Sequence, residues 1–373
     1  MHILIAPNAF KNSLNAEEAA KAISSGLQKS GLKCTVTEFP IADGGDGTGA
    51  LLIKRLKGET FLSTVRDPLG RSINASYGFL NNKTAIIEMA NASGLRLLKP
   101  AEYDPLHANS YGTGQLITAC ISLGAETIIL CIGGSATVDG GTGMLNALGI
   151  KFIDRFGVEL KDLPFSLLQL SDIILTPVFF ERKNRKYIVL CDVENTLLGE
   201  TGSAAVFGPQ KGASPSQVKE LDRCLTQLRD IALPVTGKDM ATVKHGGAAG
   251  GIAAAFDAFL DATLVNGIDY FLNITKFPEE LQKANLVITG EGSLDQQTLH
   301  GKGPMGVAKL AKQYEIPVIG MAGNIENDEM LREYFQELIC INETGSSLES
   351  NILNAKSNLE KAAENLGTRL AQK

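Results

Sequence analysis

The sequence of 373 residues has no tryptophan, and aromatic residues make up only 6% of it. It also lacks an excess of positive charge, since 35 Lys and Arg stand against 41 Asp and Glu and give a formal net charge of −6. A surface that binds nucleic acid is normally basic. The composition therefore argues against nucleic acid as a partner.

No apolar run is long enough to cross a membrane, and the best runs, such as residues 127–132, have the length of a strand. The apolar residues 3–6 have no lysine or arginine before them, unlike a secretory signal peptide. The six cysteines, of which Cys120 and Cys131 lie closest in sequence, form no Cys-x-x-Cys pair. We therefore expect a cytoplasmic protein, without a membrane partner, whose cysteines are reduced core residues.

Three common catalytic patterns are also absent: Gly-x4-Gly-Lys-Ser/Thr, Gly-x-Ser-x-Gly and His-Glu-x-x-His. P-loop NTPases, α/β-hydrolases and zinc proteases thereby lose their main support. Glycine is abundant, with 39 residues, where an average usage of about 7% would give about 26. Much of the excess lies in loops that follow predicted strands.

Short apolar runs alternate with helical periodicity, which is typical of an α/β fold with mainly parallel sheets. A helix is predicted over residues 15–30, opened by the capping-box spacing of Asn15 and Glu18. Both chain ends show the same βαβ pattern. We predict one discontinuous flavodoxin-like (Rossmann-like) domain from residues 1–65 and 285–373, with a second α/β domain, residues 66–284, inserted and carrying a glycine-rich loop.

That loop, residues 133–143, reads Gly-Gly-Ser-Ala-Thr-Val-Asp-Gly-Gly-Thr-Gly between a predicted strand and a predicted helix. Such a turn exposes backbone N–H groups and points a helix N-terminus at negative charge. We interpret it as a phosphate or sugar-acid site rather than a structural turn. Its candidate ligand-binding residues are Gly133, Gly134, Ser135, Thr137, Asp139, Gly140 and Gly141.

Two further loops carry carboxylates directly after predicted strands. Asp43 and Asp46 lie among glycines in residues 41–48, and Glu291 precedes Ser293 and Lys302 in residues 289–303. Ligands of open α/β sheets bind at the carboxyl ends of strands, and Mg²⁺ prefers oxygen ligands. The sequence favours a nucleotide with its metal here. An ordinary Asp-Gly turn is the alternative for the first loop.

Weaker signals are Lys11 after the first strand, Asp192 after a strand in the middle, and the pair Arg66 and Arg71. The two arginines flank a Pro-Leu-Gly turn and could bind a carboxylate, although exposed turn charges are the commoner explanation. The pattern Gly301-x-Gly303-x-x-Gly306 formally matches a dinucleotide fingerprint. It does not directly follow a strand, which the fingerprint requires, so we discount it.

Taken together, these motifs resemble the type 1 glycerate kinase family of bacterial enzymes. The similarity extends over nearly the whole chain, in order, through residues 6–11, 42–48, 110–114, 133–143, 191–193, 206–212, 247–251 and 288–302. The resemblance implies a two-domain α/β enzyme with its active site in the cleft. It also implies transfer of the γ-phosphoryl group of ATP to the 2-hydroxyl of D-glycerate, giving 2-phosphoglycerate and ADP.

The chain departs from the usual family pattern at a few positions. Relatives usually carry Asp-Ser where Asn8 and Ala9 stand, Glu where Asp46 stands, and Asn where Val138 stands. Because Asn8 stands where relatives carry a carboxylate, the essential acids are sought at Asp43, Asp192 and Glu291 instead.

We assign hypothetical roles on this basis. Asp192 deprotonates the attacking hydroxyl, and Lys11 and Asp43 complete the catalytic set. Arg66, Arg71, Ser293 and Lys302 join the glycine loop in binding phosphate or substrate. Asp43, Asp46 and Glu291 hold Mg²⁺.

Other functions remain open. Phosphorylation of the 3-hydroxyl or of a related hydroxy acid is the nearest alternative, and a non-catalytic hydroxy-acid sensor is a more distant one. A nicotinamide-dependent oxidoreductase would need the dinucleotide turn directly after a strand. The sequence does not distinguish a monomer from a homodimer.

Overall fold

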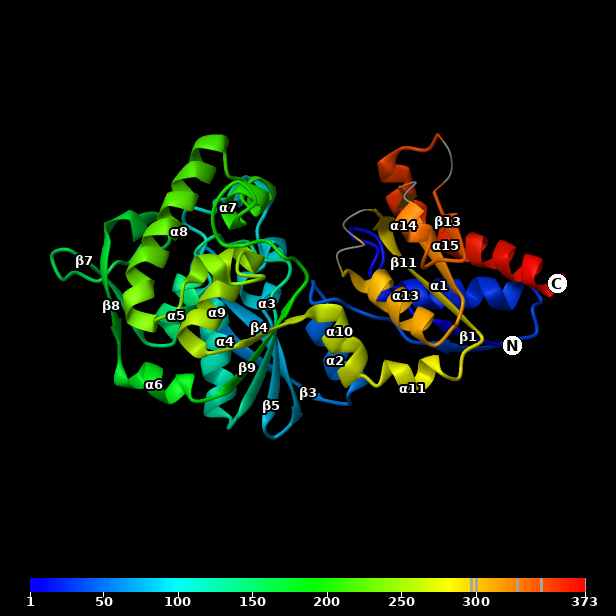
Figure 1. Cartoon of the computed structure of the whole chain (residues 1–373), viewed down its shortest axis with the longest axis horizontal. Helices are drawn as coiled ribbons and strands as arrows, with labels where there is room; N and C mark the ends of the chain where they lie inside the picture. The colour runs from blue at the N-terminus through cyan, green and yellow to red at the C-terminus, as the bar shows by residue number, and fades with distance from the viewer. Residues whose placement is uncertain (296–297, 299–300, 327–328, 343–344, 373) are drawn as a thin grey trace. The chain divides into compact units, whose positions relative to one another are not determined.

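The computed structural model describes residues 1–295, 298, 301–326, 329–342 and 345–372. The chain divides into two compact units. Unit 1 comprises Met1–Asp43 and Ile268–Lys373, and unit 2 comprises Gly44–Gly267. Figure 1 shows the chain coloured along its length, with both ends in the same unit.

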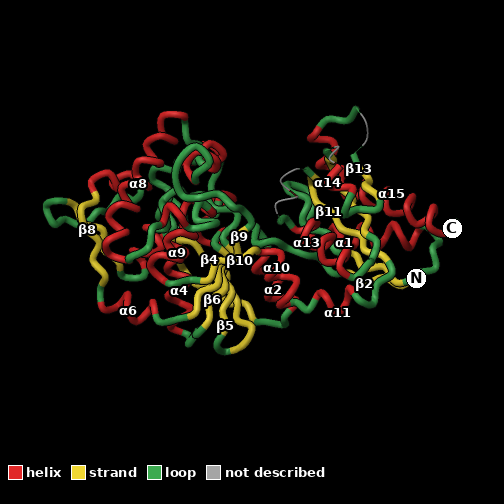
Figure 2. Tube along the Cα trace, viewed as in Figure 1, coloured by secondary structure: helices red, strands yellow, loops and turns green. Residues whose placement is uncertain are grey.

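Unit 1 is built on a parallel five-stranded sheet with strand order β13-β12-β11-β1-β2 (Figure 2). Numbered along the chain, this order is 2-1-3-4-5, which is that of flavodoxin-like folds. The order reverses between β1 and β11, so their carboxyl ends form the expected ligand position. The strands are β1 (His2–Ile5), β2 (Thr35–Glu38), β11 (Leu286–Leu294), β12 (Val318–Ile325) and β13 (Glu337–Cys340).

Helices cover this sheet, and the predicted first helix forms. The side chain of Asn15 accepts from the backbone of Glu18, whose carboxylate accepts from the backbone of Asn15 in return. Helices α1 and α15 pack against each other at Gly26, where an added Cβ would lie 2.1 Å from Glu360 O. The helices are α1 (Ala16–Lys29), α10 (Gly267–Ile274), α11 (Phe277–Leu281), α13 (Gly303–Gln313), α14 (Glu329–Arg332) and α15 (Leu348–Ala371).

Unit 2 contains a six-stranded sheet of order β10-β9-β6-β5-β4-β3. Neighbours from β5 to β10 are parallel, whereas β3 and β4 add an antiparallel edge. The strands are β3 (Glu59–Arg66), β4 (Ser72–Asn81), β5 (Thr84–Glu88), β6 (Thr127–Cys131), β9 (Lys186–Cys191) and β10 (Thr263–Asn266). A separate antiparallel pair joins β7 (Ile150–Asp154) to β8 (Leu170–Leu175).

The helices of unit 2 pack around one large apolar core that includes Ile128, Leu130 and Phe256. They are α2 (Thr48–Arg55), α3 (Ala90–Ser93), α4 (Tyr111–Ser122), α5 (Thr142–Ala147), α6 (Pro177–Lys183), α7 (Ser203–Phe207), α8 (Pro215–Thr236) and α9 (Ile252–Leu260). The predicted fold class, two α/β domains with one flavodoxin-like and discontinuous, is confirmed.

The junctions between units differ from the predicted boundaries at residues 65 and 285. Residues 44–65 belong with unit 2 because α2 packs on β5 and because β3 pairs with β4 along its whole length. Residues 268–284 belong with unit 1, where Ile268 lies against Gly306 of α13 and Phe277 makes an edge-to-face contact with Phe39. Tertiary packing, which the order of strands and helices along the sequence does not reveal, therefore decides where one unit ends and the other begins.

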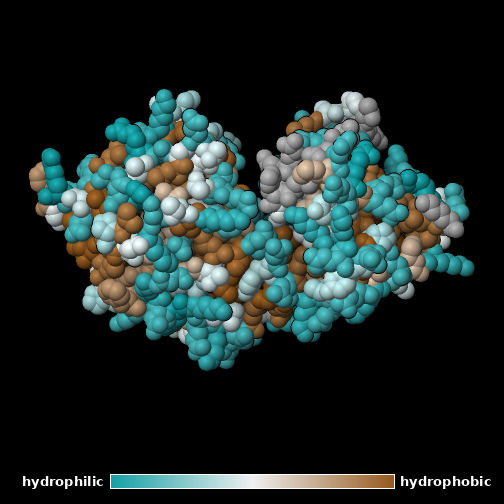
Figure 3. Space-filling model, viewed as in Figure 1, coloured by the Kyte–Doolittle hydropathy of each residue, from teal (hydrophilic) through white to brown (hydrophobic). Residues whose placement is uncertain are grey.

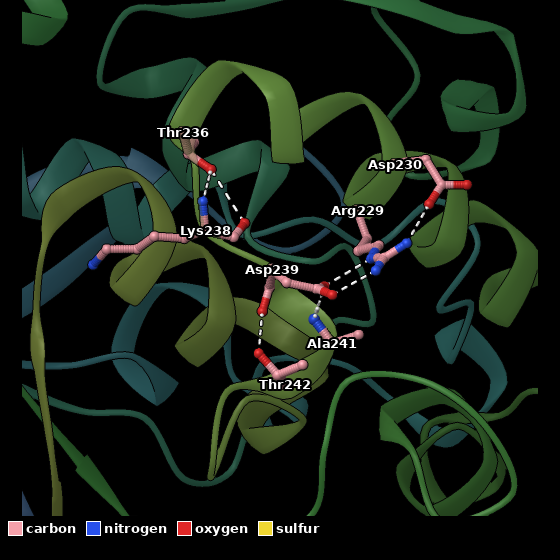
Figure 4. Close-up of polar contacts among 7 residues, drawn as sticks. All are labelled: Arg229, Asp230, Thr236, Lys238, Asp239, Ala241 and Thr242. Atoms are coloured by element: carbon pink, nitrogen blue, oxygen red, sulfur yellow. Dashed lines mark hydrogen bonds and ion pairs between the residues drawn. The ribbon is translucent and has the colours of Figure 1, made fainter.

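A polar cluster fixes the end of α8 to the segment that follows it (Figure 4). Arg229 binds Asp239 with two guanidinium nitrogens, of which Nε lies 2.7 Å from Oδ1, and it also reaches Asp230. Asp239 in turn caps the short helix Met240–Thr242 through the backbone of Ala241. This segment leads to the glycines at 246–251, of which Gly250 and Gly251 pack against the 133–143 loop.

Figure 3 shows hydrophilic residues over most of the visible face, with apolar residues scattered among them. In the part of the chain that the structure describes, no helix is both long and apolar enough to cross a membrane. All six cysteines are free thiols, and four of them are buried as expected. The expectation is wrong for Cys340, which is exposed, and Cys34 is only half-buried.

The close packing of α1 on α15 predicts that Gly26→Ala changes stability in the direction opposite to that expected from helix propensity. On helix propensity alone, Gly26→Ala would stabilise the chain by about 1 kcal/mol. Because the new methyl group overlaps Glu360 O and Ala363 Cβ, we expect the free energy of unfolding to fall by about 1–2 kcal/mol instead. Denaturant unfolding measures the change, with Lys21→Ala on the exposed face of α1 as the control. A more stable Gly26→Ala variant would contradict the packing.

Candidate active site

In unit 1, polar side chains gather at the carboxyl ends of β1, β2 and β11. Asn8 follows β1, and its backbone N–H donates to Gly290 O of β11 at 2.8 Å. Its side-chain Nδ2 donates to Asp43 Oδ2 at 2.9 Å, and Asp43 lies beyond the end of β2. Glu291 belongs to β11 itself. The sheet thus brings Asn8, Asp43 and Glu291 to the point where its strand order reverses.

Asp43 also contacts the start of helix α13. The backbone N–H of Gly303 donates to Asp43 Oδ2 at 3.2 Å, and Lys302 occupies the N-cap position. A carboxylate near a helix N-terminus is stabilised by the helix dipole. An added Cβ at Gly303 would lie 2.9 Å from Asn8 Nδ2, so the glycine permits this close approach.

Glu291 is buried, with 8% of its surface exposed. Burial raises its pKa to about 8, the negative charge of Asp43 acts in the same direction, and Lys302 and the hydroxyl of Thr298 oppose the rise. Thr298 Oγ1 donates to Glu291 Oε1 at 3.2 Å. Asp43 and Glu291 are neighbouring carboxylates, and a divalent cation prefers oxygen ligands of this kind.

A pocket of about 270 Å³ adjoins these groups. Lys11, Glu291, Ser293 and Lys302 all line it, so four predicted site residues share one cavity. Lys11 is exposed, whereas Ser293 and Lys302 are half-buried.

In unit 2, the glycine loop follows β6 and Asp192 follows β9, the neighbouring strand. Glu88 ends β5 on the other side of β6. The carboxyl ends of three adjacent parallel strands therefore carry the glycine loop, Asp192 and Glu88. Asp192 itself is half-buried.

Much of the glycine loop is buried framework rather than open surface. Asp139 has no exposed surface, and its carboxylate accepts from Ser110 N and Oγ and from the N–H groups of Gly141 and Gly143. Gly140 N donates to Gly250 O at 2.9 Å. The first helical turn of α5 thus points at Asp139 rather than at an external anion. Of the predicted ligand-binding residues in this loop, only Gly133 and Gly134 are not buried.

Lys211 lies beneath this loop and is itself buried, with 3% exposed. Its Nζ donates to Ser135 Oγ at 2.8 Å and to Thr137 O at 2.7 Å. Burial lowers the pKa of Lys211 to about 7, and the negative charge of Asp139 opposes that shift. Because the Ser135 oxygen already accepts a hydrogen bond from Lys211, the Ser135 hydroxyl proton points elsewhere and can be donated to another group.

Asp46 belongs to a second cluster, with Glu88 and Arg96. Arg96 binds Asp46 and Asn91, and lies 3.6 Å from Glu88 Oε1. Glu88 accepts from Gly47 N at 2.9 Å and Gly49 N at 3.1 Å, at the start of α2. Burial raises the pKa of Glu88 to about 7, and Asp46 contributes in the same direction.

The predicted metal ligands divide between the two units. Asp43 and Glu291 are neighbours in unit 1, whereas Asp46 belongs to unit 2 and pairs with Arg96. Within the described ranges, no three side chains of His, Cys, Asp or Glu are grouped as a metal site.

The two arginines have protein partners. Arg71 binds Asp67 at 2.5 Å and Glu102 at 2.6 Å, which fixes the turn at 67–71. Arg66 lies over the ring of Tyr111 at 5.2 Å. Both guanidinium groups remain exposed.

Comparison with known proteins shows the family to which the chain belongs. The sequence pattern that defines the glycerate kinase family matches residues 3–371. The chain belongs to the glycerate kinase family. Among similar proteins are a glycerate kinase of Halalkalibacterium halodurans, 44% identical over 87% of this chain and 85% of that protein, and a glycerate 2-kinase of Escherichia coli K12, 44% identical over 88% and 86%.

A solved structure shows the same fold. The crystal structure described as a glycerate kinase 2 from Salmonella typhimurium LT2 superposes with a TM-score of 0.84 at 39% identity. The match covers 100% of this chain and 98% of that one. The predicted family is therefore confirmed.

Sequence reasoning missed three charged residues of this glycerate kinase family member. Lys211 lies in one of the blocks that carry the resemblance, and only its burial reveals its contact with Ser135. Glu88 is the last residue of an apolar strand in the sequence, and nothing in the sequence indicates that it is buried beside Asp46. Arg96 is unremarkable in sequence, and only the fold brings it to Asp46.

The depressed pKa of Lys211 has a measurable consequence for stability. Between pH 7 and 10.5, the ordinary pKa of a lysine, the unfolded chain holds the proton that folded Lys211 releases, so the free energy of unfolding rises with pH. We expect wild type to gain up to about 1.4 kcal/mol per pH unit relative to Lys211→Met as pH rises above 7. Chemical denaturation from pH 7 to 9.5 measures the difference. Lys219→Met, at an exposed site on α8, serves as the control, and parallel curves for wild type and Lys211→Met would disprove the shift.

Proposed function

We propose that this protein is an ATP-dependent glycerate 2-kinase. It transfers the γ-phosphoryl group of ATP to the 2-hydroxyl of D-glycerate and releases 2-phosphoglycerate and ADP. The observation that carries this proposal is the match to the glycerate kinase family over residues 3–371, with the E. coli glycerate 2-kinase 44% identical. The carboxylates and lysines at the strand ends of unit 1 are the groups that such chemistry needs.

Phosphoryl transfer requires mainly positioning and charge neutralisation. In unit 1, Lys11 and Lys302 would neutralise phosphate or carboxylate oxygens, and Ser293 would donate a hydrogen bond. In unit 2, Gly133, Gly134 and the hydroxyl of Ser135, oriented by Lys211, would bind an anionic group. Thr137, Asp139, Gly140 and Gly141, all buried, would hold the loop in shape.

Asp43 and Glu291 would hold Mg²⁺, and Asp46 is a weaker candidate because Arg96 already neutralises it. The bound ion would supply positive charge to the phosphate oxygens of ATP. Glu291 would lose its proton when a cation binds, since the charge would offset both burial and Asp43.

Asp192 would accept the proton of the glycerate 2-hydroxyl. The hydroxyl oxygen would attack the γ-phosphorus of ATP while the bond between that phosphorus and the β,γ-bridging oxygen breaks, which releases ADP. Asp192 follows β9 directly and is half-buried, which suits a base that must stay accessible. Arg66 and Arg71 remain candidates for binding the substrate carboxylate. Arg71 is the weaker of the two because two carboxylates already bind it.

The first experiment is an assay with ATP, Mg²⁺ and D-glycerate, with the product identified by phosphorus NMR. We expect 2-phosphoglycerate, loss of turnover in EDTA, and recovery when Mg²⁺ is added in excess. Formation of 3-phosphoglycerate would support the kinase activity but show that the 3-hydroxyl, and not the 2-hydroxyl, is phosphorylated. Glycerate binding without turnover would favour a sensor.

Replacement of the proposed base separates chemistry from binding. Asp192→Asn should lower kcat by about 10²–10⁴-fold, because the attacking hydroxyl loses its proton acceptor. The Kd for ATP should stay within twofold of wild type. Glu194→Gln, two residues away and exposed, is the matched control and should keep full activity. An unchanged kcat for Asp192→Asn would remove Asp192 from the mechanism.

A further inference from the structure

The pocket of unit 1 has two chemically different sets of lining residues. One set is charged and contains Lys11, Glu291 and Lys302, and the other includes the start of helix α15. The roles proposed above use only the charged set. The remaining wall has no part in phosphoryl transfer, yet it makes up much of the cavity of about 270 Å³.

That wall is apolar and comes from three separate segments. Phe10 lies in the loop after β1, Ile341 directly follows β13, and Ile352 and Ala355 belong to α15. Phe10, Ile341 and Ala355 are buried, and Ile352 is half-buried. The backbone carbonyl of Ile352 accepts from Ser13 Oγ at 2.8 Å, which anchors this turn of α15 to the loop after β1. The wall is therefore an anchored part of the fold.

Three amide side chains also line the pocket. Asn12 lies in the loop after β1, Asn342 follows Ile341, and Asn351 lies one residue before Ile352 on α15. An amide presents a donor and an acceptor side by side, which is the pattern needed to pair with the edge of a nucleobase. Ligand pockets commonly combine an apolar lining with a few polar groups of this kind.

We propose that this wall binds the purine base of ATP, with the phosphates directed toward Lys11 and Lys302. The inference rests on the proposed kinase function and assigns the nucleoside part of its substrate. D-Glycerate is a poor occupant of the apolar part of the wall, because a small, fully polar acid would lose its hydration against Phe10, Ile341 and Ile352. A base has apolar faces for the wall and polar edges for the amides.

The position in the fold supports the same assignment. The pocket opens where β1 and β11 end, at the reversal of strand order in a flavodoxin-like sheet. Nucleotides and related cofactors bind at this position in open α/β sheets.

Two variants of α15 test the wall. Ile352→Asp places a charge against the base, and Ala355→Phe fills the space that the base would occupy. We expect each to raise the KM for ATP at least tenfold, while kcat and the KM for glycerate change less than twofold. Leu353→Asp is the matched control, since Leu353 lies next to Ile352 but is 78% exposed and does not line the pocket. It should behave as wild type.

Binding measurements keep the test independent of turnover. By isothermal titration, both variants should bind ADP at least tenfold more weakly than wild type and bind tripolyphosphate, which has no base, equally well. Equal loss for both ligands would overturn the assignment, as would an unchanged affinity for ADP or a rise in the KM for glycerate alone. If wild type binds ADP without phosphorylating glycerate, the proposed function fails while the base site stands.

A third measurement needs no substitution, so it does not depend on the variants folding. ADP that carries a photoreactive azide on its base should label wild type on peptides that contain residues 341–342 or 348–355. Unlabelled ADP should suppress the reaction. Labelling confined to the glycine-rich segments 133–143 or 246–251 would place the base in unit 2 and overturn the proposal.

Discussion

The buried carboxylate of Asp139 is the contact on which the arrangement of unit 2 depends. It joins the start of α4, through Ser110, to the first turn of α5, through Gly141 and Gly143. A buried ionised carboxylate is costly unless hydrogen bonds and a nearby cation offset its lost hydration. Here four hydrogen-bond donors, from Ser110, Gly141 and Gly143, offset the hydration that Asp139 loses, and Lys211 lies near enough for the charge of Asp139 to oppose the fall in its pKa. Through Lys211, the same centre sets the direction of the Ser135 hydroxyl.

Each unit also keeps a pair of acids close together at its strand ends. In unit 1 the pair is Asp43 and Glu291, and in unit 2 it is Asp46 and Glu88. The two pairs are neutralised differently. Arg96 binds Asp46 and lies near Glu88, where burial still raises the pKa of Glu88 to about 7. In the first pair burial raises the pKa of Glu291 to about 8, and the cation that opposes this rise is Lys302.

Much of the fold could be predicted from local signals. Asn15 and Glu18 mark the start of α1, and short apolar runs mark the parallel strands of both sheets. The β3–β4 edge, the β7–β8 pair and the junctions at 43 and 268 were less accessible, because partly exposed strands alternate weakly and because packing decides which unit a segment joins. The motif residues Asp43, Glu291, Ser293 and Lys302 share a region because β2, which precedes Asp43, and β11, which contains Glu291 and Ser293, both pair with β1. The buried state of Asp139 and the partners of Arg71 depend on contacts between distant segments, which no motif records.

The discontinuity of unit 1 has a consequence for how the chain is made. Strand β1 pairs with β11, which begins at Leu286, and α1 packs on α15, which begins at Leu348. During synthesis, the first 43 residues therefore leave the ribosome long before their partners exist. Unit 2 is continuous in sequence, and domains generally fold as units in order of synthesis. The nascent amino-terminal segment must consequently stay unpaired while the inserted unit folds, and its apolar strand β1 is exposed to chaperones and to aggregation until β11 and α15 have been made.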